Sequence, residues 1–92
     1  MNEQPQDGTD LLQFPCEFPI KVMGLRTDRF AQTVLEVLLQ HVPDFDAGTL
    51  EMRASSGGKY LSVTGTFVAV SRAQLDGLYR ALSAHPDVSM VL

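Results

Sequence analysis

The sequence contains a single cysteine, no tryptophan and no long apolar run. One thiol, Cys16, excludes an intrachain disulfide and a metal site built from several cysteines. No apolar stretch approaches the ~18 residues that a membrane-spanning helix needs. The chain starts with polar and acidic residues, the reverse of a secretion signal. We therefore expect a cytoplasmic protein with no membrane partner and no metal or other cofactor.

Positive charge is also scarce, with 7 Lys and Arg against 11 Asp and Glu and a formal net charge of −4. Three unpaired acids lie in the first ten residues, and removing these three charges from −4 leaves −1 for the remainder. The basic excess typical of nucleic-acid binding is absent, so no nucleic-acid partner is expected. Residues 1–10 offer nothing to bury and are predicted to form a mobile acidic tail. Residues 11–92 have the length of one domain.

In the first half of this domain, two elements follow from apolar periodicity. Phe18, Ile20 and Val22 share one face and Lys21 and Met23 share the other, which predicts a strand over residues 18–24. Thr27 is a suitable N-cap for a helix that extends to about Val42, because an apolar stripe at helical spacing follows it.

The second half predicts a strand over residues 49–55, a glycine-rich hairpin turn over 56–59 and a strand over 60–69. Ser71-Arg72-Ala73-Gln74 is typical of a capping box and starts a second helix that ends before Pro86. A last strand is expected over residues 87–92, with Val88, Met90 and Leu92 facing inward.

The order strand, helix, strand, strand, helix, strand predicts an α+β fold of the ferredoxin-like βαββαβ type. Right-handed crossovers then give a four-stranded antiparallel sheet with two helices on one face. The first and third strands become central, and the second and fourth become edges.

Catalysis is not expected, and no catalytic residue is assigned. An acylphosphatase-like enzyme needs an arginine after the first strand to hold its acyl phosphate and an asparagine nearby to position water. Arg26 meets the first requirement, but the only asparagine is Asn2, in the predicted tail. An acylphosphatase-like enzyme therefore stays a minor alternative. His41 at a helix end and His85 in a loop have no recognisable catalytic partner, since a nucleophile needs a base and an orienting group.

A regulatory domain of the ACT type presents a glycine-containing loop where backbone N–H groups meet an anionic ligand. Gly24, Arg26 and Thr27 supply a glycine, a cation and a hydroxyl between the first strand and the first helix. Many strand–helix loops contain glycine, so an ordinary turn is the alternative interpretation.

A family resemblance rests on several short motifs that are specific in combination: Phe14-Pro15, Phe18, Lys21-Val22-Met23-Gly24, Ser55-Ser56-x-Gly58-x-Tyr60-x-Ser62-Val63 and Met90-Val91-Leu92. Together they resemble the YbeD-like family of small uncharacterised bacterial proteins, over about Leu11 to Leu92. The resemblance implies a ferredoxin-like fold related in shape to ACT domains. It also implies a regulatory role, because members have been labelled lipoate-binding regulators. It carries over no catalytic residues.

A second candidate site lies on the open face of the predicted sheet. Lys21 and Met23 of the first strand are expected beside Ser62 and Thr64 of the third, with Arg53 nearby. A lysine among hydroxyls suits a small anionic ligand. The alternative is that Lys21 only solubilises this face, paired with Glu51.

The leading hypothesis is thus a non-catalytic regulatory or interaction module for a small anionic ligand or a protein partner. The alternative is a protein-interaction or homodimerisation module that uses a sheet edge or the open face. The last strand is apolar and contains no lysine or proline, and such edges favour pairing with another chain.

Overall fold

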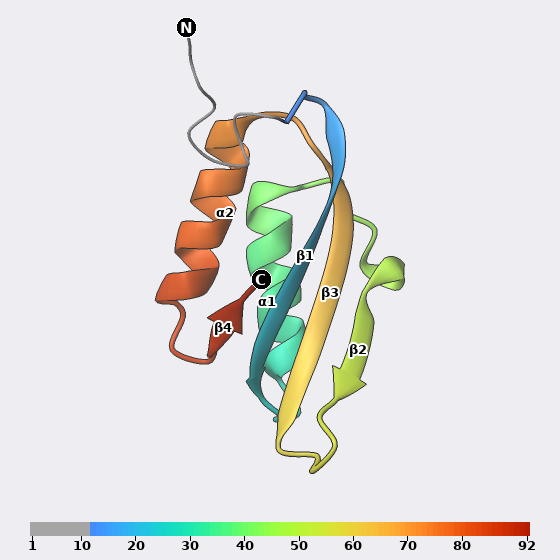
Figure 1. Cartoon of the computed structure of the whole chain (residues 1–92), viewed down its shortest axis with the longest axis vertical. Coiled ribbons are helices and arrows are strands. Elements are labelled where there is room, and N and C mark those ends of the chain that lie inside the picture. Colours follow the sequence, from blue (N-terminus) through green and yellow to red (C-terminus); the bar gives the residue numbers. More distant parts are fainter. Residues whose placement is uncertain (1–11) are drawn as a thin grey trace, which may run out of the picture.

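The computed structural model describes residues 12–92, and the predicted acidic tail lies outside this part of the chain. Figure 1 shows the elements in chain order: β1 (Cys16–Leu25), α1 (Phe30–His41), the 3₁₀ helix η2 (Ala47–Thr49), β2 (Glu51–Ala54), β3 (Tyr60–Ala69), α2 (Arg72–Ala84) and β4 (Met90–Val91). The α+β class and the βαββαβ order are as predicted.

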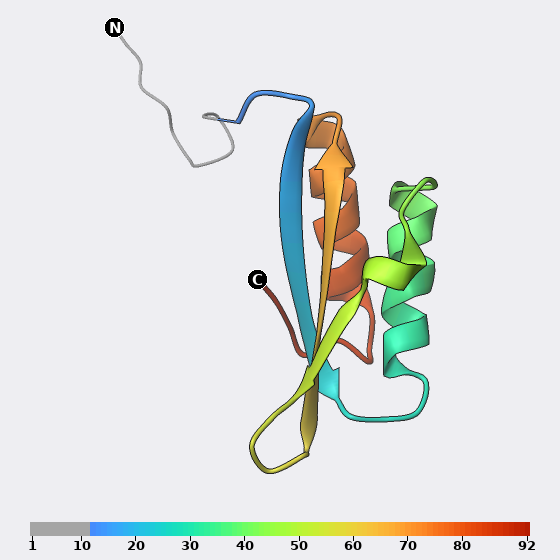
Figure 2. The ribbon, with the colours of Figure 1, turned by 90° about the vertical axis from the view of Figure 1, so that its right-hand side faces the viewer.

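The four strands form one antiparallel sheet in the order β2-β3-β1-β4. Its centre is the long pairing of β1 with β3, which runs from Cys16 opposite Ala69 to Leu25 opposite Tyr60. In Figure 2 both helices lie on one side of this sheet, and no helix covers the other side. The molecule therefore has two layers and one open sheet face, as expected from the one-sided alternation of β3.

The core lies between the sheet and the helices and is wholly apolar among the described residues. The sheet contributes Ile20, Val22, Val63, Phe67 and Ala69, and the helices contribute Phe30, Val34, Val37, Leu38, Leu75, Leu78 and Leu82. The helical members repeat every three or four residues, which is the spacing that keeps side chains on one face of a helix. The apolar stripe predicted for the first helix therefore lies in the core.

Strand β1 starts earlier than predicted, at Cys16 rather than Phe18. Proline has no N–H to donate to a sheet, yet Pro19 lies opposite Thr66 within the ladder. Lys21 bonds through its N–H and C=O to Leu92 on the β4 side. Backbone N–H and C=O groups alternate in direction along a strand, so the nitrogen of Pro19, two residues before Lys21, also points toward the β4 side of β1. Strand β4 does not extend as far as Pro19. The missing N–H therefore costs no bond to β3.

Helix α1 starts later than predicted. Its N-cap is Arg29, no side chain caps it, and the assignment of Thr27 as N-cap is wrong. The carbonyl oxygen of Thr27 accepts a hydrogen bond from the N–H of Phe30 (3.3 Å) instead of the threonine hydroxyl capping the helix. A turn thus precedes the helix, and Phe30 becomes its first residue, with its ring buried.

Strand β2 is shorter than the predicted 49–55 because a 3₁₀ helix takes its first residues. The Asp46 carboxylate accepts the N–H of Gly48 (3.0 Å), and the Thr49 hydroxyl donates to the Asp46 carbonyl oxygen (2.7 Å). These local bonds compete with strand formation, as short polar side chains commonly do. The hairpin that follows needs glycine at Gly58, where φ is 75°.

Ser71 is the N-cap of α2, as the predicted capping box requires, although the side chain of Gln74 reaches the N–H of Val70 rather than that of Ser71. The Ser71 hydroxyl accepts the N–H of Gln74 (3.1 Å), and the Gln74 side-chain oxygen accepts the N–H of Val70 (2.8 Å). The amide nitrogen of the same glutamine donates to the carbonyl oxygen of His41 (2.9 Å), at the end of α1. One side chain therefore starts α2 and joins it to the neighbouring helix.

Strand β4 is much shorter than residues 87–92, and part of its predicted orientation is wrong. Met90 and Leu92 are exposed by 51% and 57%, whereas Val91 packs against the core. Val91 lies opposite the buried Val22, and opposite residues of an antiparallel pair share a face. The alternating pattern fits either register, and a shift of one residue reverses every side chain.

Candidate functional site

The open face brings five of the eight predicted site residues together. Two rows of opposite residues cross β2, β3 and β1 there: Glu51, Thr64 and Lys21 in one row, and Arg53, Ser62 and Met23 in the next. Residues in such rows point to the same side of the sheet. The sequence placed Lys21, Met23, Arg53, Ser62 and Thr64 on one surface, and the structure agrees.

Four of these side chains, those of Lys21, Arg53, Ser62 and Thr64, line a shallow depression of about 470 Å³ together with Glu51 and Met52. Lys21 and Arg53 are exposed, while both hydroxyl residues are half-buried. Within residues 12–92, no ion pair or side-chain hydrogen bond engages Lys21, Arg53 or Glu51. The suggested pairing of Lys21 with Glu51 is therefore not formed, and both cations remain available.

The spacing of the two cations suits a small anion. Lys21 and Arg53 lie two strands and two residues apart, which separates their Cα atoms by roughly 12 Å. Both side chains are long enough to converge above the Ser62 and Thr64 hydroxyl groups between them. Two positive charges against the one negative charge of Glu51 leave the depression with an excess of one positive charge.

An apolar region borders the depression. A second hollow of about 290 Å³ is lined by Met23, Tyr60, Ser89 and Met90. Met23 lies opposite Ser62 on one side and Met90 on the other, so the polar and apolar parts meet at this residue. Met90 was not predicted as a site residue, because the sequence pattern assigned its side chain to the core. Pairing between β1 and β4 brings it onto the open face.

Gly24, Arg26 and Thr27 belong to a different part of the molecule. Gly24 is buried in the core-facing row of β1. A Cβ atom there would overlap the Asp87 carbonyl oxygen and the ring of Phe30, including its Cζ atom at 2.7 Å. The need for glycine at this position is thus explained by close packing of the α2–β4 loop and α1.

Arg26 and Thr27 are exposed in the loop that follows β1. The N–H of Arg26 donates to the carbonyl oxygen of Lys59 (2.9 Å), which fixes the loop to the β2–β3 hairpin. Neither residue lines the depression on the open face. Ligand binding by this loop stays a prediction, and it concerns a second surface.

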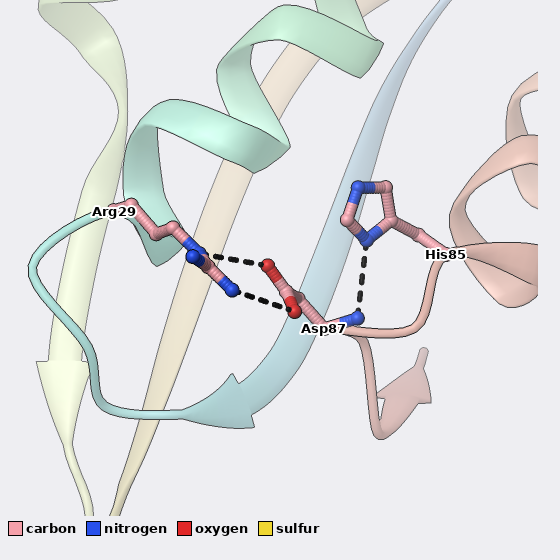
Figure 3. Close-up of polar contacts among 3 residues, drawn as sticks. All are labelled: Arg29, His85 and Asp87. Carbon is pink, nitrogen blue, oxygen red and sulfur yellow. Dashed lines mark hydrogen bonds and ion pairs between the residues drawn. The ribbon is translucent and has the colours of Figure 1, made fainter.

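A group that sequence reasoning did not find joins the start of α1 to the α2–β4 loop (Figure 3). The Arg29 guanidinium contacts both carboxylate oxygens of Asp87, at 3.3 and 3.5 Å, and the His85 Nδ1 atom accepts the N–H of Asp87 (3.1 Å). In the neutral imidazole the proton therefore sits on Nε2. Arg29 and Asp87 are 58 residues apart, and only the tertiary fold brings them together.

No catalytic arrangement is visible among these contacts. His41 Nδ1 lies 3.1 Å from the carbonyl oxygen of Val37, and no described contact joins His41 or His85 to a hydroxyl or thiol. Cys16 is half-buried against the core. Residues 12–92 contain no cluster of three His, Cys, Asp or Glu side chains suited to a metal ion, and no helix long and apolar enough to span a bilayer.

Among residues 12–92, the phenol of Tyr79 has a pKa that departs from its ordinary value. Burial raises the pKa of the Tyr79 phenol above its usual value of 10.0. Its hydroxyl donates to the carbonyl oxygen of Leu92 (3.3 Å), and its ring meets that of Phe18 edge-on, with 6.4 Å between centroids. Tyr79 therefore connects α2 to the end of the chain and is part of the packing, away from the depression.

Comparison with solved structures supports the fold. Protein HP0495 from H. pylori matches with a TM-score of 0.72 and 18% identity, over 100% of this chain and 98% of that chain. The ACT domain from the GTP pyrophosphokinase of Chlorobium tepidum matches with a TM-score of 0.61 and 15% identity, over 83% and 84%. At these identities the likeness concerns the fold alone.

Sequence relatives are much closer. A UPF0250 protein of Bordetella pertussis is 57% identical over 99% of this chain and 98% of its own length. Another, of Chromobacterium violaceum, is 45% identical over the full length of both chains. Residues 9–92 match the model of a family described as a protein of unknown function, DUF493. The predicted YbeD-like resemblance is thus confirmed, and the chain belongs to the DUF493 (UPF0250) family.

Proposed function

We propose that this chain is a non-catalytic regulatory module that binds a small anion with an apolar portion on the open face of its sheet. The observation that carries the proposal is the depression of about 470 Å³ in which Lys21 and Arg53, both without an ionic partner among residues 12–92, flank two hydroxyl groups. Charge-assisted hydrogen bonds to these cations are the strong polar contacts available to a carboxylate or phosphate.

The apolar hollow beside the cations supports a ligand of mixed character. A carboxylate held by Lys21 and Arg53 leaves its hydrocarbon part over Met23 and Met90. Methionine side chains adapt to irregular apolar ligands. Members of the YbeD-like family have been labelled lipoate-binding regulators, so lipoate and octanoate, both carboxylates with an apolar chain, are suitable probes.

The absence of catalysis is part of the proposal. Arg26, the residue that an acylphosphatase-like enzyme would use, lies in the loop after β1 and outside the depression. Asn2, the only asparagine, lies outside the described residues. We expect no hydrolysis of acetyl or benzoyl phosphate. A cytoplasmic location and the lack of a nucleic-acid or membrane partner also stay predictions.

The test is an amide NMR titration with octanoate, lipoate and a mixture of amino acids. We expect saturable shifts with octanoate or lipoate around Lys21, Met23 and Arg53. Replacing Lys21 by Glu reverses the charge at the centre of the site and should abolish these shifts without unfolding the domain, because Lys21 is exposed.

Arg80→Glu is the matched control. It makes the same change of two charge units on the exposed surface of α2, on the opposite side of the sheet. Binding should persist in this variant. Unchanged affinity in Lys21→Glu, or equal loss in both variants, contradicts the proposed site. Shifts confined to Gly24, Arg26 and Thr27 instead assign binding to the loop.

A homodimerisation module is the second candidate. Exposed Met90 and Leu92 support it, because both lie at the β4 edge and on the open face. Sedimentation at increasing concentration tests self-association, and a protein that stays monomeric removes this alternative.

A further inference from the structure

Strand β2 forms an edge of the sheet, and all four of its residues are exposed. In Figure 1 it lies at the right-hand margin of the sheet, with no strand beyond it. An edge strand presents unpaired N–H and C=O groups to any chain that can pair with it. The direction of these groups and the order of the side chains decide which partner fits.

The hairpin identifies the outward groups. The N–H of Ser55 donates to the carbonyl oxygen of Tyr60 (2.8 Å), so Ser55 directs its backbone groups toward β3. Direction alternates along a strand, and therefore Met52 and Ala54 direct theirs away from the sheet. The N–H of Leu50 is used by the carbonyl oxygen of Ala47 (3.3 Å), which leaves the Leu50 carbonyl for the same outer edge.

The charges on β2 are complementary to those of the same strand reversed. Glu51 and Arg53 flank Met52, and neither has an ionic partner among residues 12–92. If two copies of β2 lie antiparallel with Met52 opposite Met52, each Glu51 lies opposite Arg53 of the other copy. Opposite charges facing each other across an antiparallel pair are stabilising.

We propose that the outer edge of β2 is a surface for a second copy of this chain, paired antiparallel about a twofold axis at Met52. The same register joins the outward groups: the two Met52 residues exchange two hydrogen bonds, and each Ala54 N–H meets a Leu50 carbonyl. The Glu51–Arg53 pairs then occupy non-hydrogen-bonded positions, where side chains lie closest. In a twofold dimer both copies use the same surface, so a contact from one residue to another of the partner always occurs twice, once in each direction.

Burial adds to the pairing. Met52 is 59% exposed in the single chain, and in the proposed dimer the two Met52 side chains lie opposite each other at the twofold axis. The β4 edge, predicted from sequence as the dimer surface, offers less. It has two residues, and only Val91 directs backbone groups outward, because Leu92 bonds to Lys21. The β2 edge is therefore the better supported of the two.

Charge-reversed variants test the register by sedimentation velocity of the full chain. The wild-type protein should self-associate reversibly. Glu51→Arg and Arg53→Glu should each weaken association at least about tenfold, since two attractive pairs become repulsive. Mixing these two variants restores both opposite-charge pairs, so heterodimers should form. The double variant Glu51→Arg/Arg53→Glu should associate with itself like the wild type.

Two controls separate this surface from the others. Leu92→Lys places a lysine at the β4 edge on an exposed side chain and should leave association unchanged. Lys21→Glu removes the proposed anion site but lies outside the β2 edge, so it should also leave association unchanged. A monomeric wild type, unimpaired single variants, or a mixture that fails to associate overturns the proposal, whatever the outcome of the ligand titration.

Discussion

Replacing Gly24 by Ala tests whether this glycine serves packing. The added Cβ atom would overlap the Asp87 carbonyl oxygen, which is backbone, and the ring of the buried Phe30. Such overpacking costs typically about 1–3 kcal/mol. The lower entropy of the unfolded alanine chain offsets roughly 0.4–1 kcal/mol. Because backbone has to move, we expect a net loss of about 1–2 kcal/mol in the free energy of unfolding.

The assay is urea denaturation followed by circular dichroism, with thermal melting alongside. For a domain of this size, a loss of about 1–2 kcal/mol corresponds to a Tm lower by roughly 4–16 °C. Gly57→Ala is the matched control, since a Cβ atom at Gly57 meets nothing within 4 Å. The control should be as stable as the wild type or more stable by up to about 1 kcal/mol.

The pair of variants also separates packing from ligand binding. If Gly24 is present only to admit an anion to the loop, alanine would lower affinity and leave stability unchanged. A Gly24→Ala protein as stable as Gly57→Ala would refute the packing explanation. It would support the hypothesis that the loop with Gly24, Arg26 and Thr27 binds the anion.

Two further changes probe α2. Ser71→Ala removes the oxygen that accepts the N–H of Gln74 and should lower the free energy of unfolding by about 1 kcal/mol in urea denaturation. Unchanged stability would show that this cap does not stabilise the helix. The pKa of Tyr79 is raised in the folded state. The contribution of its protonated phenol to folding stability is therefore present at neutral pH and is lost as pH rises from about 10 through the folded pKa. Tyr79→Phe should flatten this alkaline fall in stability, and an identical pH profile would contradict the assignment.

The sequence alone predicted most of the fold, because the periodicity of apolar residues agrees with the capping and turn residues that separate the helices and strands. The alternation of β3 predicted its bounds, Tyr60–Ala69, and Ser71 with Gln74 predicted the start of α2. Local competition limited the rest. A turn displaced the cap from Thr27, and the bonds of Asp46 turned the start of β2 into a 3₁₀ helix. Whether the local hydrogen bonds or the predicted cap and strand form depends on hydrogen-bond geometry, which residue type does not specify.

Residues that share one strand face by alternation were assigned to the candidate site from the sequence. Lys21, Met23, Ser62 and Thr64 could be placed on one surface once β1 and β3 were expected to be neighbours. The same reasoning failed for Met90, because a two-residue strand carries too little pattern to fix its register.

The sequence by itself determined the order of the elements, the apolar stripes that form the core and the one open face of the sheet. The tertiary structure decided which β4 side chains face solvent and that Arg29 pairs with Asp87. It also decided that Asp87 and Phe30 occupy the space where a side chain at position 24 would lie. The physical reason is the range of the interactions. Periodicity follows from neighbours along the chain, whereas close packing and ion pairs between distant residues exist only after the layers have come together.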